Sequence, residues 1–351
     1  MRAVLTPRYG SSDVLTFAEV SAPTPAAGEI LVDVHAAAVT RGDDRLRGAE
    51  FPGFTAVIGR SIFGFTRPRQ PLQGTMFAGR VAAIGEGVTR FAVGDDVFGE
   101  VANGAYAEQL VVREDAGVAH VPDGFDFTDV APLGYGAVTS LVFLRDIGAV
   151  QPGEHVVVVG AGGGVGRYAV QVASHLGARV TAVASARHDA LLRDLGVETI
   201  VRPGEALPAT ADVVFDTSGT SHVGDWRDQM AATGRFLTTD LTVRLIVDLL
   251  LANFRSGPRT RFGVGEVTAD NLATVAELLE SGALRPVIGH RFAFEDAAAA
   301  HRCVHEERPN GDVVIEVRAS REATVTAMRR TPDAAPRTGG AFGPTVARAA
   351  A

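Results

Sequence analysis

Cysteine is nearly absent from this sequence. Cys303 is the single cysteine among 351 residues, so the chain cannot close an internal disulfide and has none of the multi-cysteine spacings that bind zinc. A chain without disulfides is typical of a reducing compartment. We therefore expect the protein to be cytoplasmic.

A long apolar run and an excess of positive charge are also missing. The most apolar run, Leu241–Phe254, has 14 residues and is interrupted by Arg244 and Asp248, so it is too short and too charged to span a bilayer. We interpret it as a buried or interface helix, with a mobile lid over a substrate pocket as the alternative. Residues 1–8 lack the apolar core of a signal peptide. The net charge of −8 argues against a nucleic-acid partner, and we expect a small-molecule substrate and no membrane.

Aliphatic residues, by contrast, are plentiful, and their order predicts a β-rich first part. Hydrophobic residues make up 46% of the chain, and 351 residues are enough for two domains. Up to residue 125, short apolar or alternating runs are separated by turn signals, which is typical of strands. These runs are Arg2–Leu5, Glu29–Ala36, Met76–Ile84, Asp96–Phe98 and Tyr106–Val112.

From residue 127 onward, helical patterns alternate with short apolar strands, which predicts a doubly wound parallel sheet. The expected strands are His155–Val159, Ala178–Ser185, Thr199–Val201, Asp212–Phe215, Arg235–Thr238 and Arg261–Val264, and the expected helices cover 167–177, 186–195 and 270–281. After about residue 284 the pattern is β-rich again and ends in the run Gly311–Val317. We therefore expect a cofactor domain, residues 126–284, inserted into a barrel-like domain, residues 1–125 and 285–318. Residues 319–351 lack periodicity, so we expect a disordered tail.

The most informative stretch is a glycine-rich turn between a Val-rich strand and a helix. Such a turn lets backbone N–H groups at the helix N-terminus approach a pyrophosphate. Its register departs from G-x-G-x-x-G because Ala161 occupies the first position. A flexible surface turn is the alternative, but the strand before and the helix after favour a dinucleotide site. The predicted cofactor-binding residues here are Gly160, Ala161, Gly162, Gly163, Gly164, Val165 and Gly166.

The residues after the next strand indicate which dinucleotide is bound. NAD-specific sites place an acidic residue about 20 residues beyond the glycine turn, where it holds the ribose 2′-hydroxyl. Here that place holds Ser185 to His188, and the first acid is Asp189. Hydroxyl and guanidinium donors suit a 2′-phosphate, which a carboxylate would repel. Ser185 and Arg187 therefore favour NADPH over NADH, with a merely solvated Arg187 as the alternative.

Several further motifs, in this order and spacing, resemble one known family. The stretches that carry the resemblance are residues 1–20, 28–39, 74–81, 88–91, 94–99, 216–219 and 284–288, together with the glycine turn. They are similar to the medium-chain dehydrogenase/reductase superfamily, in its zinc-independent quinone oxidoreductase branch, over residues 1–317. The resemblance implies a fold with a GroES-like β-barrel domain plus a doubly wound parallel-sheet (Rossmann) cofactor domain. It also implies a homodimer.

The zinc ligands are the main departure from the alcohol dehydrogenases of that superfamily. Those enzymes use an early Cys, a Gly-His-Glu stretch and a further Cys or acid. Here the early position falls at Thr40 and Arg41, and Gly74-Thr75-Met76 replaces Gly-His-Glu. Because Thr and Met are not credible Zn²⁺ ligands, we predict that the site holds no metal. Without a Lewis acid, reduction of a quinone or an enone is favoured, because the substrate itself delocalises the developing charge.

The resemblance also assigns residues to the site. Residues 40–43 occupy the place of the family's V-N-P-x-D segment, which lines the nicotinamide pocket. There Thr40 can offer a hydroxyl and Arg41 a positive charge to a substrate oxygen, with a salt bridge from Arg41 to Asp43 or Asp44 as the alternative. Tyr135 is an additional proton donor or a half-buried structural residue. The predicted catalytic residues are Thr40, Arg41, Asp43 and Tyr135, and Thr139, Thr217 and Ser218 complete the cofactor site. The family's Gly-Lys near the last strand appears as Gly311-Asp312, which puts a basic cofactor contact there in doubt.

The leading functional hypothesis is an NADPH-dependent reductase that transfers a hydride to a quinone or to the β-carbon of an enone. An enoyl reductase that acts on a carrier-bound or polyketide intermediate is one alternative. A non-catalytic NADPH-binding protein is the other, in which the departures at Thr40, Arg41 and Asp312 would record a lost activity.

Overall fold

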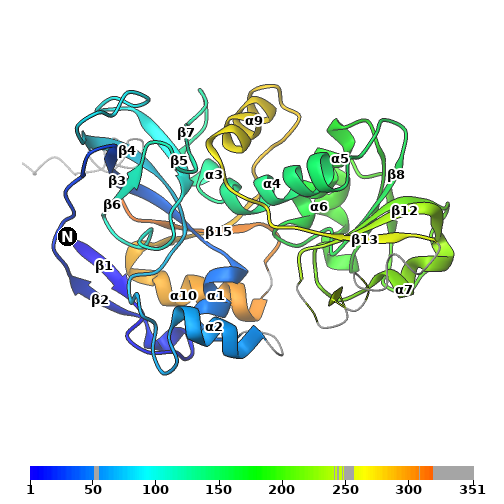
Figure 1. Ribbon diagram of the computed structural model, residues 1–351, viewed down its shortest axis with the longest axis horizontal. Helices are drawn as coiled ribbons and strands as arrows, with labels where there is room; N and C mark the ends of the chain where they lie inside the picture. The colour runs from blue at the N-terminus through cyan, green and yellow to red at the C-terminus, as the bar shows by residue number, and fades with distance from the viewer. Residues whose placement is uncertain are drawn as a thin grey trace, which may run out of the picture. The chain divides into compact units, whose positions relative to one another are not determined.

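Three β-sheets organise the chain in the computed structural model (Figure 1). The structure describes residues 1–50, 55–240, 242, 245, 246, 248, 257–307 and 309–318. The expected tail, 319–351, and most of the run 241–254 lie outside these residues, so both expectations stay predictions. Residues 1–318 pack as one unit, and the predicted domain boundaries also stay predictions.

The larger part of the second half of the chain is a six-stranded sheet whose strands are all parallel. Its strands are β8 (His155–Val159), β9 (Arg179–Val183), β10 (Thr199–Val201), β11 (Ala211–Asp216), β12 (Met230–Thr238) and β13 (Arg259–Phe262). Every residue of β8 is buried, as expected for a β-branched strand that is covered on both faces. The strand order is β10-β9-β8-β11-β12-β13. The chain direction across the sheet therefore reverses between β8 and β11, and such a switch point is where doubly wound sheets bind their ligands.

Strands from both ends of the chain form a seven-stranded sheet. Its members are β3 (Glu29–Val39), β4 (Met76–Ile84), β5 (Asp96–Glu100), β6 (Gln109–Arg113), β7 (Val118–His120), β14 (Ile288–Ala293) and β15 (Asp312–Glu316). The long strand β3 pairs with β4, β6 and the late strand β15. Because β15 returns to β3, the parallel sheet is an insertion within this barrel-like part. A separate antiparallel pair is formed by β1 (Arg2–Leu5) and β2 (Thr16–Glu19). The expected fold class is confirmed.

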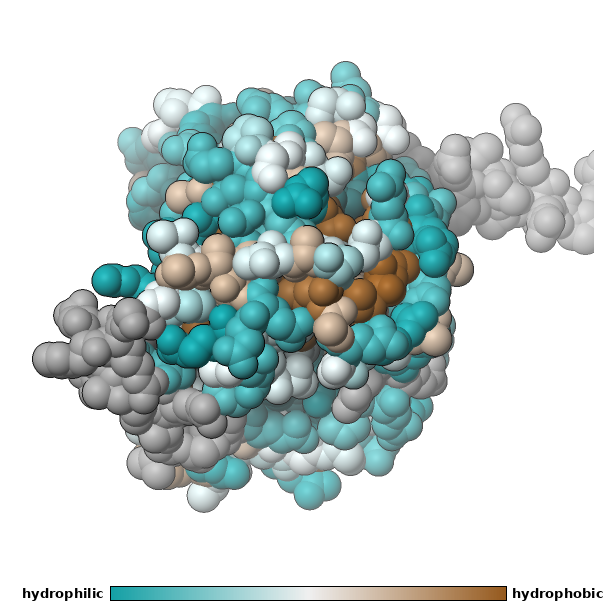
Figure 2. All heavy atoms as spheres, turned by 90° about the vertical axis from the view of Figure 1, so that its right-hand side faces the viewer, coloured by the Kyte–Doolittle hydropathy of each residue, from teal (hydrophilic) through white to brown (hydrophobic). Residues whose placement is uncertain are grey.

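Strand β13 forms one edge of the parallel sheet. Within the described ranges β13 pairs with β12 alone, so its outer edge has no strand beside it. Figure 2 views the molecule from the right-hand side of Figure 1 and shows apolar side chains gathered in a band between hydrophilic ones. Val264, two residues beyond β13, is 76% exposed.

None of the described helices combines the length and the apolarity that a membrane crossing requires.

Short helices connect the strands and cover their faces. The helices are α1 (Arg41–Gly48), α2 (Thr55–Phe63), α3 (Phe127–Val130), α4 (Leu133–Leu141), α5 (Gly166–His175), α6 (Asp189–Asp194), α7 (Val223–Trp226), α9 (Ala269–Glu280) and α10 (Ala297–Arg302). A π-helical turn extends α4 to residue 147, and another follows α10 to residue 307.

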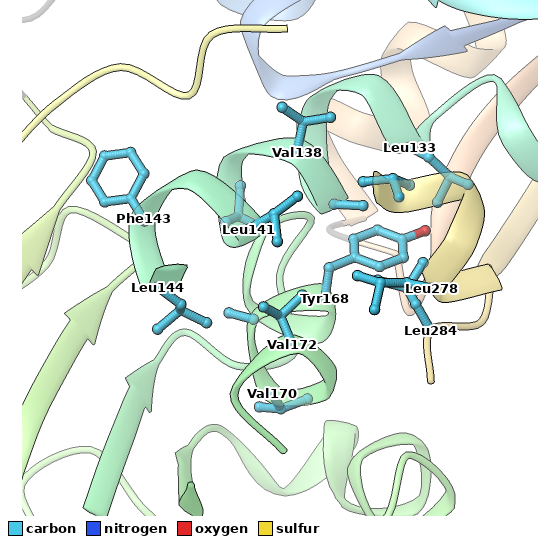
Figure 3. Packing of buried hydrophobic residues seen from close by; sticks show 14 of the residues in the cluster. Leu133, Val138, Leu141, Phe143, Leu144, Tyr168, Val170, Val172, Leu278 and Leu284 are labelled. Carbon is cyan, nitrogen blue, oxygen red and sulfur yellow. The ribbon is translucent and has the colours of Figure 1, made fainter. Parts of the chain in front are cut away.

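The central helix α4 lies between the two large sheets, and this position places the site. One buried apolar cluster joins α4 and α5 to Phe98 of the barrel sheet and to Val156 of the parallel sheet. Figure 3 shows the part of this cluster in which α4 and α5 pack together. The two helices approach each other closely at Gly136, where an added Cβ would lie 2.6 Å from the carbonyl oxygen of Gly164 and 2.7 Å from the ring of Tyr168. Small residues on α4 therefore let the first turn of α5 sit next to it.

Candidate functional site

The glycine turn lies at the switch point and presents free backbone donors. The N–H of Gly163 donates to the carbonyl of Gly160 at 2.8 Å, which folds the turn back on itself. In the part of the chain that the structure describes, the N–H groups of Gly162, Gly164 and Val165 have no protein acceptor. They stand at the N-terminus of the ten-residue helix α5. Free amide donors at such a helix end form an anion-binding site that suits a pyrophosphate.

Close contacts explain why this turn is made of glycine. An added Cβ on Gly166 would lie 2.2 Å from the carbonyl oxygen of Gly160. One on Gly162 would lie 2.2 Å from the ring of His188. Gly160 has φ +75°, and its Cβ would lie 2.8 Å from Cβ of Ser218. These three positions therefore have no room for a side chain, and at them the backbone is the surface that a ligand would meet.

The end of β9 carries the residues that the sequence predicted for a 2′-phosphate. Ser185 and Arg187 are both exposed, and the Nε of Arg187 donates to Nε2 of His188 at 3.0 Å. Burial and the charge of Arg187 lower the pKa of His188. The guanidinium of Arg202 also lies here, held by two 2.7 Å hydrogen bonds to the carboxylate of Asp189. Sequence reasoning missed Arg202, although it follows β10, whose carboxyl end meets that of β9 at one edge of the sheet.

The predicted residues after β11 are held against the glycine turn. The hydroxyl of Thr217 donates to the carbonyl of Val159 at 2.8 Å. The fully buried carboxylate of Asp216 accepts from the N–H and the hydroxyl of Ser218 at 2.8 and 2.7 Å. Thr139 is buried on α4, next to the segment after β13, where a Cβ on Gly265 would lie 2.9 Å from its Oγ1.

A buried ion pair lies behind the turn. Nη2 of Arg167, whose side chain is 4% exposed, is 2.9 Å from Oδ1 of Asp312, and the hydroxyl of Tyr168 donates to the same carboxylate. Nε and Nη1 of Arg167 are buried without a partner among the described residues. An added Cβ on Gly164 would lie 3.6 Å from Nη2 of Arg167. Although position 312 is acidic, a cation is present next to the glycine turn, because Asp312 pairs with Arg167 there.

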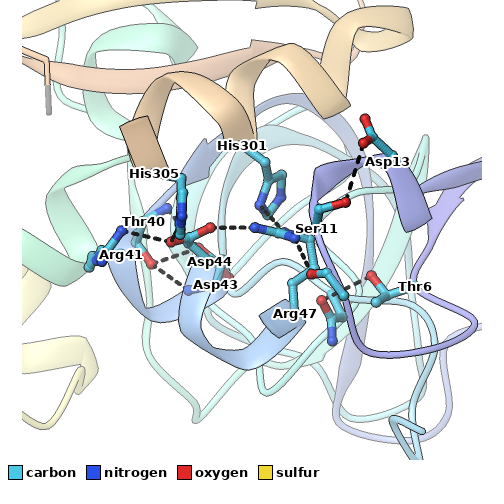
Figure 4. Close-up of polar contacts among 12 residues, drawn as sticks. Thr6, Ser11, Asp13, Thr40, Arg41, Asp43, Asp44, Arg47, His301 and His305 are labelled. Atoms are coloured by element: carbon cyan, nitrogen blue, oxygen red, sulfur yellow. Dashed lines mark hydrogen bonds and ion pairs between the residues drawn. The ribbon is translucent and has the colours of Figure 1, made fainter. Parts of the chain in front are cut away.

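The predicted catalytic segment begins helix α1 (Figure 4). Thr40 is the residue before its first turn, and its hydroxyl donates to the carboxylate of Asp43 at 2.6 Å. The Asp43 carboxylate also accepts from the N–H of Thr40 at 2.8 Å, and the N–H of Asp43 donates to the hydroxyl oxygen of Thr40 at 3.2 Å. The two residues therefore cap the helix reciprocally. Asp43 is 2% exposed, and burial raises its pKa. The hydroxyl of Thr75 lies 3.5 Å from the same carboxylate.

The neighbouring carboxylate, Asp44, is surrounded by basic groups (Figure 4). Nη1 of Arg41 lies 2.8 Å from it, Nη2 of Arg47 lies 2.5 Å from it and Nδ1 of His305 lies 3.0 Å from it. Although burial opposes the effect, His305 and Arg47 lower the pKa of Asp44. The pair between Arg41 and Asp44 is the alternative that the sequence left open, and a contact of Arg41 with substrate stays a prediction. Behind this network, burial lowers the pKa of His301 to about 3, so it stays neutral.

Two further acidic side chains complete this end of the site. Tyr135 lies in the first turn of α4 and is 38% exposed. Partial burial raises its pKa, the charge of Arg45 opposes this, and the charges of Asp43 and Asp240 add to it. Glu100, the last residue of β5, is half-buried. Burial and the charge of Asp43 raise its pKa to about 7. Sequence reasoning did not single out Glu100, although the alternation along residues 96–100 was the available signal.

The described residues hold one group with spacing suited to a metal ion. It consists of Asp44, Glu50 and His305, whose ligand atoms lie within 4.8 Å of one another. Because two arginines already pair with Asp44, this carboxylate is a poor ligand for a cation. At the positions of the zinc ligands named above, Thr75 bonds to Asp43 and Met76 lies on the face that packs against α4.

Comparisons with known proteins agree with this architecture. Residues 26–123 match the family described as alcohol dehydrogenase GroES-like domain, and residues 195–315 match the family described as zinc-binding dehydrogenase. A quinone oxidoreductase of Pseudomonas aeruginosa is 28% identical over 332 residues, which cover 88% of this chain and 97% of that protein. The polyketide synthase GfsB of Streptomyces halstedii is 32% identical over 261 residues, 71% of this chain. The chain spans only 5% of the length of that synthase.

Two solved structures are similar along nearly the whole unit. The quinone oxidoreductase from Coxiella burnetii has a TM-score of 0.80 and 25% identity, and it covers 91% of this chain and 99% of its own. The CurK enoyl reductase has a TM-score of 0.78 at 22% identity over 90% of this chain and 98% of its own, which shows the shared fold alone. The matched domain families and the similar structures agree with a GroES-like part joined to a Rossmann-like parallel sheet. The chain belongs to the medium-chain dehydrogenase/reductase superfamily.

Proposed function

We propose that the protein is an NADPH-dependent reductase that transfers a hydride to a quinone or to the β-carbon of an α,β-unsaturated carbonyl compound. The observation that carries the proposal is the glycine turn at the switch point, with its free N–H donors and with Arg187 beyond the next strand. A nicotinamide cofactor supplies the hydride when it is bound. The quinone oxidoreductases similar to this chain support the same reaction class.

Three groups of described residues support this choice of cofactor. The free N–H groups of Gly162, Gly164 and Val165 would hold the pyrophosphate. The hydroxyl of Ser185 and the guanidinium of Arg187 are exposed and would hold a 2′-phosphate, which is why we propose NADPH. On the other side of the turn, Thr139, Thr217 and Ser218 would lie beside the nicotinamide half.

The chemistry of the remaining residues favours a reaction without a metal. The hydroxyl groups of Thr40 and Thr75 face the carboxylate of Asp43. With those hydroxyls directed at Asp43, the groups left for a substrate oxygen are the weak acid Tyr135 and the cation Arg41. Such groups are sufficient when the substrate delocalises its own charge, as a quinone or an enone does, but they are not sufficient to stabilise an alkoxide in place of Zn²⁺.

A second candidate function is the reduction of a carrier-bound enoyl intermediate. The similarity to the polyketide synthase GfsB, at 32% identity, favours it. Both functions add a hydride to the β-carbon of a conjugated carbonyl compound, so they share the same site residues. They differ in the length of substrate that the site must accept.

A substrate panel followed by NADPH absorbance tests the proposal. We expect NADPH consumption with quinones, short enones or enoyl thioesters, no reaction of simple alcohols with NADP⁺, and no loss of activity after treatment with a chelator. Binding of NADPH without consumption in any arm would show a non-catalytic binding protein. Loss of activity on chelation, restored by Zn²⁺, would refute the metal-free part.

We also propose that the protein is a homodimer. The outer edge of β13 carries unpaired backbone groups among the described residues, and such an edge can extend its sheet across a second copy. The mass measured by light scattering should be twice that of the chain, and a monomer at micromolar concentration would contradict this.

A further inference from the structure

The imidazole of His188 is packed onto the glycine turn. His188 ends the short helical turn Ala186–His188 that follows β9, and it is 7% exposed. A Cβ added to Gly162 would lie 2.2 Å from Cγ of His188 and 2.5 Å from its Nδ1, so the ring lies directly against the backbone there. The position of the ring is therefore set by the same turn that presents free N–H donors to an anion.

The hydrogen bond between His188 and Arg187 shows which ring nitrogen carries the proton. Nε of an arginine always carries a hydrogen, and that of Arg187 donates to Nε2 of His188 at 3.0 Å. Nε2 is therefore the unprotonated nitrogen, and the proton of the neutral ring lies on Nδ1. A doubly protonated ring could not accept this bond. Burial and the charge of Arg187 lower the pKa of His188, which keeps the ring neutral.

Two hydrogen bonds hold Arg187 and leave the end of its side chain available. The backbone carbonyl of Arg187 accepts from Nδ2 of Asn310 at 3.1 Å, and its Nε is bound to His188. Nη1 and Nη2 make no hydrogen bond or ion pair within the part of the chain that the structure describes, and the residue is exposed. Because the guanidinium is planar, fixing Nε also directs the two free nitrogens. Such a pair suits two oxygens of one phosphate group.

We propose that His188 is a positioning residue that sets the preference for NADPH over NADH, which rests on the proposed function and deepens it. Its imidazole holds the guanidinium of Arg187 in one orientation before the cofactor binds, so less conformational entropy is lost when a 2′-phosphate is bound. The ring also joins this guanidinium to the glycine turn, which keeps a fixed spacing between the 2′-phosphate and pyrophosphate positions. His188 acts through Arg187.

Binding of NADP⁺ and NAD⁺, measured by calorimetry, tests this role without turnover. The two cofactors differ only in the 2′-phosphate. His188→Leu removes the acceptor, and we expect it to weaken NADP⁺ binding about three- to tenfold, the effect of one side chain that must be immobilised on binding, with NAD⁺ binding unchanged. His188→Gln offers an oxygen acceptor near the position of Nε2 and should keep most of the preference. His175→Leu, which changes an exposed histidine at the end of α5, is the matched control and should change neither affinity.

A double-mutant cycle supplies a readout that a merely structural role would not move. Because His188 acts through Arg187, adding His188→Leu to Arg187→Ala should not weaken NADP⁺ binding further. Further weakening in that background would overturn the role of His188. Equal losses for NADP⁺ and NAD⁺ in His188→Leu, or no loss for NADP⁺, would overturn it as well.

Nitrogen NMR of the wild-type imidazole keeps the proposal testable if His188→Leu does not fold. The signals of His188 are assigned by their absence in His188→Gln. We expect the proton on Nδ1, whereas a proton on Nε2 would overturn the proposal, because that nitrogen could not accept from Arg187. A wild-type protein that binds NADP⁺ no more tightly than NAD⁺, or binds neither, would instead refute the proposed cofactor, and this inference with it.

Discussion

The carboxylate of Asp312 should be essential for stability, because it is the one acidic group among the described residues that pairs with Arg167. The two side chains are 14% and 4% exposed, and Nε and Nη1 of Arg167 already lack a partner within the described ranges. Asp312→Ala would leave a buried guanidinium without a counter-charge. Breaking such a pair from one side costs about 3–5 kcal/mol in the free energy of unfolding. Urea unfolding of residues 1–351 measures this loss.

Two companion variants separate the ion pair from general damage. Replacing both partners, Arg167→Met with Asp312→Leu, removes the uncompensated charge and should recover most of the loss, because apolar pairs of similar volume often replace a buried ion pair without cost. Asp115→Ala breaks the exposed pair with Arg113, whose side chains are 61% and 63% exposed, and should cost less than about 1 kcal/mol. A loss below about 1 kcal/mol for Asp312→Ala would refute the reasoning from burial.

Three further predictions concern the cofactor site and pH. Arg187→Ala should weaken NADPH binding roughly tenfold, because an exposed charge-assisted hydrogen bond contributes near the lower end of about 1.5–3 kcal/mol; NADH binding should not change, and equal weakening of both would show a structural role. Gly162→Ala should lower the free energy of unfolding by about 1–3 kcal/mol, since the new Cβ would lie 2.2 Å from the ring of His188; an unchanged melting temperature would contradict this. The folded-state pKa of Glu100, about 7, is raised above the ordinary 4.5 by burial and by the charge of Asp43, so stability should fall as the pH rises from 4.5 through 7. Glu100→Gln should then be more stable than the wild type above pH 7, and equal unfolding curves would refute the raised pKa.

The fold was predictable where local pattern and tertiary structure agree. The run His155–Val159 is a strand with the predicted bounds, because four consecutive valines before a glycine turn leave few alternatives. The strands β7 and β14 were not predicted individually. Strand β7 has only three residues, and β14 is largely exposed, so neither shows a clear hydrophobic pattern. Helix α1 was missed for a different reason. Its buried residues are Asp43, Asp44 and Arg47, so a cap and ion pairs stabilise it, and a search for apolar periodicity cannot find it.

The site was predictable only as far as linear spacing reaches. Ser185 and Arg187 follow from their distance beyond the glycine turn. The pair between Arg167 and Asp312 joins residues 145 positions apart, and the sequence showed only that a lysine was missing at 312. The raised pKa of Glu100 depends on burial and on the charge of Asp43, which lies on another element. Both relations depend on how α4, α5 and the barrel strands pack, which no local pattern encodes.

Deuterium transfer from the nicotinamide tests the proposed reduction most directly. The protein is incubated with NADPH that carries deuterium on the transferable position and with an enone in ordinary water, and the product is examined by NMR. We expect one deuterium at the β-carbon, a solvent proton at the α-carbon and an intact carbonyl group. Deuterium on the carbonyl carbon of an alcohol product, or NADPH that remains bound and unoxidised, would contradict hydride transfer to the β-carbon.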